Sequence, residues 1–469
     1  MEPRRIGAVV LAAGASERFG GVKALARLRG RPLLQRVLDA VTASGLDPAV
    51  VVLGRAADQI EAGIAWRGER IVRNPDPEAG LSSSLRAGMA ALGDEVDAAL
   101  VLLADQPLVR TDVIGALVAA LEAGGRPVIV PRYAAGGGPN PVLLARPAWP
   151  LVAEASADRG LGPVLQAHPG LVRTVPVQGS NPDVDTRADL LALDWGERVR
   201  ENREQVDRVR EVPDGPDFYA PQAARFVDDP RRTGDDVLEL LRSLAAPKET
   251  WLEIGAGAGR YALALALHVR TMIALDPSPA MLGALRTSAR EHGISNIRTV
   301  EARWPVDPRD GLSALAADVA MIANVGHDVE PIGPFLDAME AAAGRCVAVL
   351  MDRQPAAAAE PFWPPIHGEA RVPLPALPEL IELLRARGAA PVVTSFARPL
   401  RPFPDVDALL DYLRGQLWLA PGSEKDRRLR DLVRADLVPR AGGVGLRSEL
   451  PMHVGVARWP GAAHGHAST

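Results

Sequence analysis

The sequence predicts two tandem α/β domains, each built on a mostly parallel, doubly wound sheet. Its 469 residues exceed the length of one typical domain, which is about 100–200 residues. Short apolar runs alternate with helical patterns twice along the chain, first up to about residue 195 and again from about residue 250. This alternation is typical of sheets covered by helices on both faces. Hydrophobic residues make up 47% of the chain, which is enough to bury large cores.

A highly charged stretch, GERVRENREQVDRVREV, separates the two series. We interpret residues 196–212 as an exposed helix that links the domains. The pattern leaves a second interpretation open, in which this stretch is the last helix of the first domain. The predicted organisation is a first domain over residues 1–195, the linker, a second domain over residues 213–458 and a disordered tail over residues 459–469.

Apolar runs mark the expected strands. In the first domain they are Ile6–Ala12, Val50–Leu53, Ala98–Leu103 and Val128–Val130, with helices such as Leu33–Ser44 and Thr111–Ala123 between them. The second domain has seven such runs: Trp251–Ile254, Thr271–Leu275, Ile297–Val300, Val319–Ala323, Val347–Met351, Pro391–Phe396 and Met452–Ala457. The last two flank a helical segment over about Val406–Leu437.

Charge and composition exclude several classes of function. The 53 basic and 58 acidic residues give a net charge of −5, which offers no reason to expect nucleic-acid binding. The single cysteine, Cys346, excludes an internal disulfide and a cysteine-based metal cage, and favours a reducing, cytoplasmic location. No stretch approaches 18 uninterrupted apolar residues, so no membrane span is expected. Arg4 and Arg5 before the run Ile6–Ala13 would also suit a signal peptide, but we interpret the run as a buried strand.

A glycine-rich loop, LAAGASERFGGVKAL, follows the first strand directly. Glycines let the backbone approach a ligand closely, and the polar and basic groups of such a loop can bind phosphate oxygens. The residues concerned are Gly14, Gly20, Gly21, Ser16, Arg18 and Lys23. The glycine spacing, and Ala24 after Lys23, distinguish this loop from a Walker A loop. The composition suits a triphosphate.

Three further segments carry polar groups that suit the same chemistry. NPDPEAGLSSSLRAG places Ser82, Ser83 and Ser84 either in a polar loop that faces a ligand or at the cap of a helix. LVLLADQPLV ends an apolar strand in Asp105, at the edge where α/β sheets bind ligands, and a buried carboxylate there suits a metal. NPDVDTRADL supplies Asp183 and Asp185, of which Asp185 is a second candidate metal ligand or a helix cap.

These segments, in this order, resemble the MobA-like nucleotidyltransferases over about residues 5–195, and most of all the molybdenum cofactor cytidylyltransferases. The matching motifs are LAAGxSxRxGxxK, SSSLRAG, LLADQP and DxDTxxD. The resemblance implies a Rossmann-like sheet and catalytic roles for Lys23, Arg18 and Asp105, with Lys23 and Arg18 at the phosphates. It implies Mg²⁺ at Asp105 and Asp185. The implied nucleotide-binding residues are Leu11, Ala12, Ala13, Gly14, Ser16 and Ser83.

The same resemblance implies the substrates. Ala13, which gives LAAG rather than LAGG, implies CTP rather than GTP as the nucleotide. The implied acceptor is molybdopterin, with or without its metal, and a molybdoenzyme or its maturation factor is the implied protein partner. The sequence departs from the family pattern at Phe19 and at Pro139, and Pro139 lies in the segment expected to bind the acceptor.

The second domain has its own glycine loop, WLEIGAGAGRYALAL, between an expected strand and helix. Gly255, Gly257 and Gly259 form G-x-G-x-G, and Arg260 stands where a dinucleotide fingerprint has its last glycine. Asp276 ends the next strand, 21 residues after Gly255, where a carboxylate can hold ribose hydroxyls.

This region resembles motifs I and II of the class I methyltransferases, over about residues 213–458, and implies S-adenosylmethionine as cofactor. The implied contacts are Gly255, Gly257 and Gly259 to the methionine and ribose, Asp276 to the ribose hydroxyls, and Met281 and Glu301–Trp304 around the adenine, with Glu253 adding a polar group. Asn324 would face the substrate side, His327 is either a base or an ordinary loop histidine, and Phe218 and Tyr219 would cover the cofactor. The resemblance does not identify the methyl acceptor.

The favoured reading is a bifunctional transferase. Three alternatives are kept: a nucleotidyltransferase whose second domain only binds S-adenosylmethionine as a regulatory module, a pyrimidine transferase acting on another phosphorylated acceptor such as a sugar or polyol phosphate, and a non-catalytic scaffold. The short region Val128–Gly170 argues against the second, and the intact charged residues of both sites argue against the third.

Overall fold

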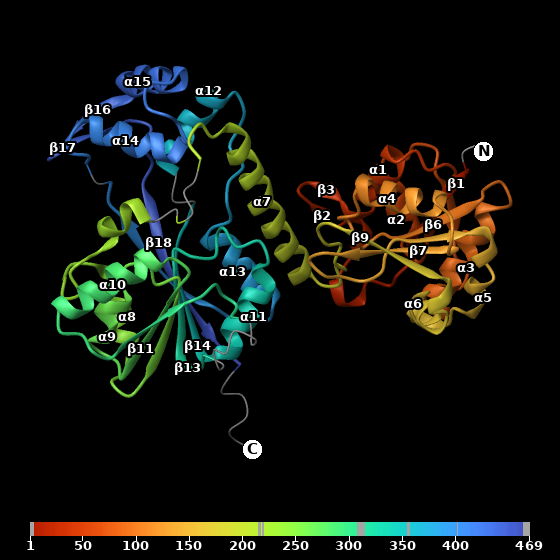
Figure 1. Ribbon diagram of the computed structural model, residues 1–469, viewed down its shortest axis with the longest axis horizontal. Helices are drawn as coiled ribbons and strands as arrows, with labels where there is room; N and C mark the ends of the chain where they lie inside the picture. The colour runs from red at the N-terminus through yellow and green to blue at the C-terminus, as the bar shows by residue number, and fades with distance from the viewer. Residues whose placement is uncertain are drawn as a thin grey trace. The chain divides into compact units, whose positions relative to one another are not determined.

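The computed structural model describes residues 4–213, 217, 220–306, 315–353, 357–400 and 402–462. The chain forms two compact units that divide between Leu190 and Leu191, and each unit contains one seven-stranded sheet (Figure 1). The prediction of two α/β domains is therefore confirmed. No helix in the described part of the chain is long and apolar enough to cross a membrane.

The N-terminal sheet has the order β5-β4-β1-β6-β8-β7-β9. Its strands are β1 (Ile6–Ala12), β4 (Ala49–Leu53), β5 (Arg70–Arg73), β6 (Ala98–Leu103), β7 (Val128–Tyr133), β8 (Val142–Ala145) and β9 (Val172–Val177). β8 pairs antiparallel with both β6 and β7, and the other pairs are parallel. A two-stranded ribbon, β2 (Arg27–Leu28) with β3 (Arg31–Pro32), lies outside this sheet.

Both faces of this sheet are covered, which explains why its central strands are wholly apolar. Ile6, Ala8 and Val10 of β1 pack with α1 (Leu33–Ala43), α2 (Ala57–Gly63) and α4 (Thr111–Glu122). Val9 and Leu11 point the other way and pack with α3 (Leu81–Leu92), α5 (Leu151–Glu154) and α6 (Gly162–Ala167). Alternate side chains of one strand thus enter two cores.

The C-terminal sheet has the order β12-β11-β10-β13-β14-β18-β15. Its strands are β10 (Thr250–Ile254), β11 (Thr271–Asp276), β12 (Ile297–Glu301), β13 (Ala317–Ala323), β14 (Ala343–Met351), β15 (Val392–Arg398) and β18 (Met452–Pro460). All seven expected runs form strands, and β18 is antiparallel to both its neighbours. The core on one face includes α11 (Ile332–Ala342) and α13 (Leu377–Ala386), and that on the other includes α8 (Asp236–Leu244), α9 (Ala262–Ala266) and α10 (Pro279–Glu291).

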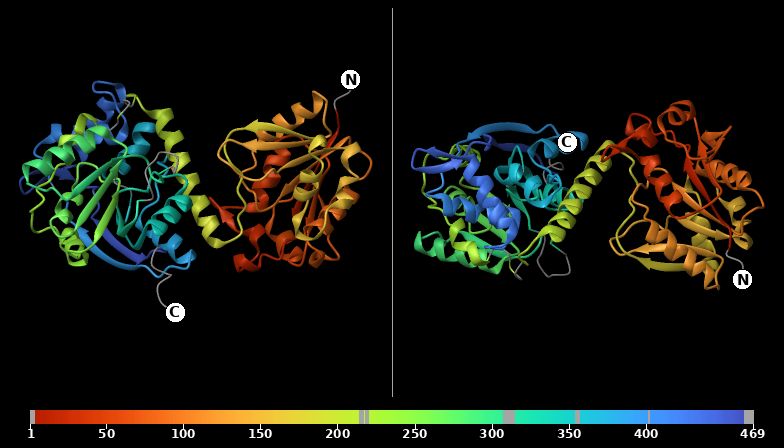
Figure 2. Two further views of the ribbon diagram at one scale, coloured as in Figure 1. Left: turned by 60° about the horizontal axis from the view of Figure 1, so that its bottom comes forward. Right: turned by 90° about the horizontal axis from the view of Figure 1, so that it is seen from above.

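A smaller helical cluster lies beyond the sheet of this unit (Figures 1 and 2). It comprises α12 (Trp363–His367), α14 (Val406–Leu417), α15 (Glu424–Asp436) and the hairpin of β16 (Leu437–Arg440) and β17 (Gly443–Leu446). These elements share a separate apolar core. The single helical segment expected over about residues 406–437 is broken after Leu417, because Trp418 adopts a left-handed conformation with φ of 59°.

Helix α7 (Arg187–Val209) differs from the expected exposed linker. Trp195, Val199, Val206 and Val209 are buried in cores of the C-terminal unit. The side chains of Asn202 and Gln205 also donate to the backbone of residues 370–372, over 2.6 and 2.8 Å. Most of the charged side chains lie on the remaining face, although Glu197 is buried. Most of this helix is therefore an integral part of the C-terminal unit.

The expected tail also begins later than residue 459. β18 continues to Pro460, Trp459 is buried, and its Nε1 donates to Glu340 Oε1 over 3.0 Å. Residues 463–469 lie outside the described part of the chain.

Candidate functional site

The first candidate site lies where the adjacent parallel strands β1 and β6 end. Leu11 is paired with Leu103 in register, and Ala104 N donates to Leu11 O over 3.0 Å. This pairing brings the glycine loop after β1 beside Asp105. The segment that holds Asp185 joins them, because Val184 N donates to Asp105 O over 2.9 Å. Three segments far apart in the sequence therefore meet at one edge of the sheet.

Lys23 lies between the two carboxylates. Its Nζ is 2.7 Å from Asp105 Oδ2 and 3.2 Å from Asp185 Oδ1. Arg18 Nη2 is 3.0 Å from the other oxygen of Asp185. Burial favours the neutral amine of Lys23, but Asp105 and Asp185 outweigh it and raise its pKa above the ordinary value. The four residues expected at the phosphates and the metal thus form one cluster of alternating charge.

Two carboxylates in this cluster have oxygens suited to a divalent cation such as Mg²⁺, which usually takes only one or two from a protein. Asp183 is close but has a different partner, since Gln106 Nε2 donates to its Oδ1 over 2.8 Å. Burial raises the pKa of Asp183. Within the described part of the chain no group of three or more His, Cys, Asp or Glu side chains could hold a metal ion together.

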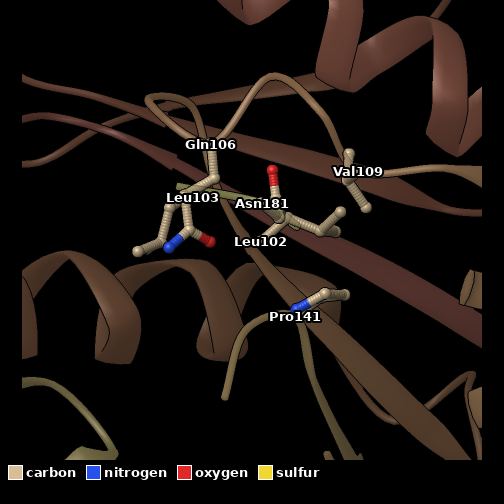
Figure 3. A pocket seen from close by; sticks show the side chains of 6 residues that line it. All are labelled: Leu102, Leu103, Gln106, Val109, Pro141 and Asn181. Carbon is tan, nitrogen blue, oxygen red and sulfur yellow. The ribbon is translucent and has the colours of Figure 1, made fainter. Parts of the chain in front are cut away.

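Gln106 and Asn181 are structural residues of this site that the sequence did not single out. Both are buried and line a small pocket with Leu102, Leu103, Val109 and Pro141 (Figure 3). Asn181 Oδ1 accepts from Leu108 N over 3.0 Å, so it fixes the turn after Asp105. The sequence signal for Gln106 was its place in the LLADQP motif. Asn181 begins the segment NPDVDTRADL, but nothing in that segment indicated its role.

The glycine loop itself presents open backbone. A Cβ placed on Gly14, Gly20 or Gly21 would meet nothing within 4 Å. Ser16 has a left-handed φ of 56°, and its Oγ accepts from Lys23 N over 3.4 Å. Leu11 is buried at the strand end, and the carbonyl of Ala13 lies where a Cβ on Gly54 would come within 2.4 Å. Any side chain at position 54 would collide with this carbonyl, so the path of the loop requires glycine there. The sequence alone does not show this requirement.

The serine run does not form a ligand-facing loop. Ser82 and Ser84 are buried in the first turn of α3. Ser83 Oγ lies 2.8 Å from the carbonyl oxygens of Asp76 and Gly80, and it accepts from Asn74 Nδ2 over 2.8 Å. It makes no side-chain cap of α3. The hydroxyl groups mainly fix the start of the helix, and a nucleotide contact by Ser83 stays a prediction.

The second candidate site is the loop after β10. Gly255, Gly257 and Gly259 all have positive φ, at 73°, 54° and 88°. A Cβ on Gly255 would lie 2.4 Å from Val325, and one on Gly259 2.8 Å from Leu263. At Gly257 a Cβ would meet nothing within 4 Å. Side-chain packing therefore requires glycine at positions 255 and 259, whereas the space beside Gly257 is open.

Asp276 holds this loop in place. Its Oδ2 accepts from Gly257 N over 2.8 Å, its Oδ1 accepts from Ser278 N over 2.9 Å, and burial raises its pKa. Ser278 Oγ accepts from Met281 N over 3.1 Å. Met281 is buried in a small cluster with Ala223 and Ala258. The loop glycines, Asp276 and Met281 are therefore neighbours, as expected for one binding site.

Two more expected residues lie close by. Glu253 is buried at the end of β10, and burial raises its pKa to about 8. Its Oε2 has no hydrogen-bond partner among the described residues. Residues 301–304 begin at the last residue of β12 and lie beside Asp276. Glu301 is paired with Asp276 in register, and Ala302 N donates to Asp276 O over 3.3 Å. Phe218 and Tyr219 lie outside the described part of the chain.

Comparison with known proteins divides the chain in the same way. Residues 8–172 match the family described as "MobA-like NTP transferase domain", and residues 252–331 match "Methyltransferase domain". The chain is 32% identical to "Nicotine blue oxidoreductase" from Paenarthrobacter nicotinovorans over 195 residues, 39% of this chain and 94% of that protein. It is 37% identical to "Bifunctional protein GlmU" from Xanthobacter autotrophicus over 26% of this chain, and spans only 28% of that protein's length. The solved structure of Rv0371c from Mycobacterium tuberculosis is 30% identical with a TM-score of 0.36, covering 40% of this chain and 96% of Rv0371c.

The matched ranges each contain one of the two sites just described. The first holds the cluster of Lys23 and Asp105, and the second holds the glycine loop and Asp276. The chain belongs to the MobA-like NTP transferase family through its N-terminal unit, and that unit is followed in the same chain by a methyltransferase domain.

Proposed function

We propose that the N-terminal unit transfers the CMP group of CTP to molybdopterin or the molybdenum cofactor, with Mg²⁺ as the metal. Nucleotidyl transfer is supported mainly by one observation, the ion pairs that Lys23 forms with both Asp105 and Asp185. Two carboxylates and two cationic side chains at the mouth of an open glycine loop suit a bound metal–triphosphate. Ala13 and the resemblance to cytidylyltransferases support CTP and the molybdopterin acceptor.

In this proposal Lys23 and Arg18 bind the phosphates of the nucleotide, and the open amides around Gly14 let the chain approach them. Asp105 and Asp185 hold Mg²⁺, which supplies charge neutralisation at the phosphates when bound. A terminal phosphate oxygen of the acceptor attacks the α-phosphorus and pyrophosphate leaves. Positioning and electrostatic stabilisation provide most of the rate in such reactions, so no protein nucleophile is needed.

The test is to incubate the protein with each nucleoside triphosphate, Mg²⁺ and molybdopterin, and to measure pyrophosphate. We expect release with CTP, faster than with GTP, and only with acceptor present. Equal or faster turnover with GTP would remove the cytidylyl assignment, and release with a sugar or polyol phosphate alone would favour another acceptor. The N-terminal cluster of two carboxylates and two cationic side chains suits phosphate chemistry and not the redox activity in the name of the nicotine blue relative.

We further propose that the C-terminal unit binds S-adenosylmethionine and transfers its methyl group. Support comes from the open backbone at Gly257 and from Asp276, whose carboxylate lies beside it. Calorimetric titration with S-adenosylmethionine should show saturable binding. Binding without turnover over a broad acceptor panel would instead favour a regulatory module that senses the cofactor.

The remaining parts of this proposal concern location and partners. The single cysteine is buried, which is compatible with a reducing compartment, and we propose the cytoplasm. We propose small-molecule substrates for both units, with a molybdoenzyme or its maturation factor as the receiver of the product and with no nucleic acid or membrane partner.

A further inference from the structure

The segment that carries Asp185 belongs to no strand or helix. It runs from residue 178 to residue 186, between the end of β9 and the start of α7. Its backbone N–H and C=O groups are therefore not fixed by a sheet ladder or by helical turns, and individual hydrogen bonds have to hold them. The bonds made to this backbone determine where the carboxylate of Asp185 lies.

On its N-terminal side the segment is attached to the turn after β6. Val184 N donates to Asp105 O over 2.9 Å, and the side chain of Val184 is buried. Asn181 Oδ1 accepts from Leu108 N over 3.0 Å. These bonds hold the segment beside Asp105, but they end one residue before Asp185.

On its C-terminal side Asp189 makes the next attachment. Its Oδ2 accepts from Asp185 N over 3.0 Å and from Thr186 N over 2.7 Å. In return, Asp189 N donates to Thr186 Oγ1 over 3.1 Å. Thr186 and Asp189 thus form a capping box at the start of α7, with aspartate in the place of the usual glutamate or glutamine. The box is unusual because the same carboxylate oxygen also accepts from the residue before the cap, which is Asp185.

This attachment leaves the carboxylate of Asp185 free for a metal. In the structure its oxygens are held by Lys23 Nζ at 3.2 Å and by Arg18 Nη2 at 3.0 Å. Both cations are proposed to bind the phosphates of the nucleotide, so they would not hold Asp185 during the reaction. Asp189 bonds the backbone of Asp185 instead, and its two bonds are compatible with a metal on the carboxylate.

We propose that Asp189 is a positioning residue for nucleotidyl transfer, which holds the backbone of Asp185 so that its carboxylate meets the metal shared with Asp105. This inference rests on the proposed Mg²⁺ site. Among the described residues no three His, Cys, Asp or Glu side chains could hold one ion together, so Asp189 acts through Asp185. Residues that orient a metal ligand in this way commonly contribute ~10–100-fold to metal affinity or activity. An ordinary helix cap would contribute to stability alone.

The first experiment separates this inference from the proposed metal site. Mn²⁺ is titrated into the full chain and the free ion is measured by electron paramagnetic resonance. The native protein should bind Mn²⁺, and Asp185→Asn should weaken the binding. If either expectation fails, the proposed metal site is wrong and this inference falls with it. If both hold, Asp189→Ala should raise the Kd by ~10–100-fold. An unchanged Kd in Asp189→Ala would overturn this inference and leave the metal site standing.

Two further variants distinguish positioning from capping. Thr186→Ala is the matched control, because it removes the hydroxyl that accepts from Asp189 N but keeps both bonds that Asp189 accepts. Its Kd for Mn²⁺ should stay near the native value. Asp189→Asn keeps an oxygen that can accept both bonds, so it should recover most of the affinity lost in Asp189→Ala. Equal losses in Thr186→Ala and Asp189→Ala would show an ordinary cap, and absence of recovery in Asp189→Asn would also contradict the inference.

Amide hydrogen exchange gives a readout that needs no metal. The N–H groups of Asp185 and Thr186 should exchange faster in Asp189→Ala than in the native protein, while the amides between β1 and β6 should not change. In pyrophosphate release, kcat should fall by ~10–100-fold, with little change in the KM for CTP, because the groups proposed to bind the nucleotide are intact. Unchanged exchange of the two amides, or a rise in KM with native kcat, would overturn the inference.

Discussion

The Nζ atom of Lys23 lies 2.7 Å from Asp105 Oδ2. The same ammonium lies 3.2 Å from Asp185 Oδ1, so one lysine bridges both carboxylates proposed to hold Mg²⁺. A cation that is to bind both carboxylates must displace it. In the proposed reaction the triphosphate oxygens would offer the ammonium an alternative partner, so nucleotide binding would release the two carboxylates for the metal.

Replacing Lys23 by Met should therefore tighten metal binding in the absence of nucleotide. The change removes the competing positive charge and leaves an apolar chain of similar length. Mn²⁺ binding followed by electron paramagnetic resonance should show a lower Kd than in the native protein, and added CTP should narrow the difference. Lys248→Met, a lysine of the C-terminal unit, is the control. An unchanged Kd in Lys23→Met would mean that the metal binds away from Asp105 and Asp185.

Replacing Asp105 by Asn should abolish nucleotidyl transfer while the protein stays folded. Asn keeps the shape but loses the charge, and loss of one main electrostatic group commonly costs ~10²-fold or more in rate. Pyrophosphate release reports the rate and circular dichroism reports the fold. Asp58→Asn, which affects a surface ion pair with Arg73, is the matched control. Near-native activity of Asp105→Asn would show that the metal lies elsewhere.

Replacing Asp276 by Ala should weaken S-adenosylmethionine binding by ~1–3 kcal/mol, the scale of a lost charged hydrogen bond. The carboxylate is proposed to contact the ribose, and it also accepts from Gly257 N and Ser278 N. Calorimetry gives the affinity. Asp318→Ala, a strand carboxylate bonded to Thr250 N, tests whether loss of any backbone-bound carboxylate has the same effect. Equal weakening by both variants would argue against a ribose contact.

The buried Glu253 predicts a pH dependence of stability. Its pKa is about 8 in the folded chain against an ordinary value of 4.5. Between these values the folded state keeps a proton that the unfolded state releases, so the free energy of unfolding should fall as the pH rises from about 5 to about 8. The unfolding transition of the C-terminal unit can be identified as the one that S-adenosylmethionine shifts. Its melting temperature should fall over this pH range, and the fall should be smaller in Glu253→Gln. An identical slope in both proteins would mean that Glu253 is ionised when folded.

Replacing Trp195 by Ala should destabilise the C-terminal unit by ~3–5 kcal/mol, the usual cost of emptying a buried aromatic position. Trp195 is 3% exposed, and its Nε1 donates to Val329 O over 3.1 Å. Chemical denaturation should show an earlier transition for this unit only. Glu204→Ala, at an exposed position of the same helix, should change stability far less. If the two variants behave alike, α7 contributes little to the core.

Strands with wholly apolar sequences were predictable from the sequence. β1 and β6 have the expected bounds because both their faces are buried, and their parallel pairing is what brings Lys23 and Asp105 together. β5, with the sequence RIVR, and β9, with the sequence VRTVPV, carry no such run and were not predicted. β8, with the sequence VLLA, is apolar but only four residues long, and it was not predicted either. The local sequence pattern was not enough to predict these strands, because their formation depends on pairing with neighbouring strands of the sheet.

The packing of α7 could not be predicted for a different reason. Its partners in the C-terminal unit lie far away along the chain, 134 residues for Trp195 with Val329 and 165 residues for Gln205 with Ala370. Three of its buried positions are polar or charged, Glu197, Asn202 and Gln205, so the sequence indicates a charged and solvated helix throughout. The role of Gly54 is likewise invisible, because it depends on where the carbonyl of Ala13 lies.

The start of α7 determines where the chain can be divided into two separately produced units. Asp189 Oδ2 accepts from the backbone N of Asp185 and Thr186, over 3.0 and 2.7 Å, so the first turn of the helix steadies a proposed metal ligand. A few residues later Trp195 is already part of the other unit's core. A chain that ends after Asp185 would lack Asp189, which holds the backbone of Asp185. A second chain that begins after Trp195 would lack this buried tryptophan and leave a cavity in its core. Because Leu191 and Ala192 also pack against that core, a cut should fall between Asp189 and Leu191 to spare both.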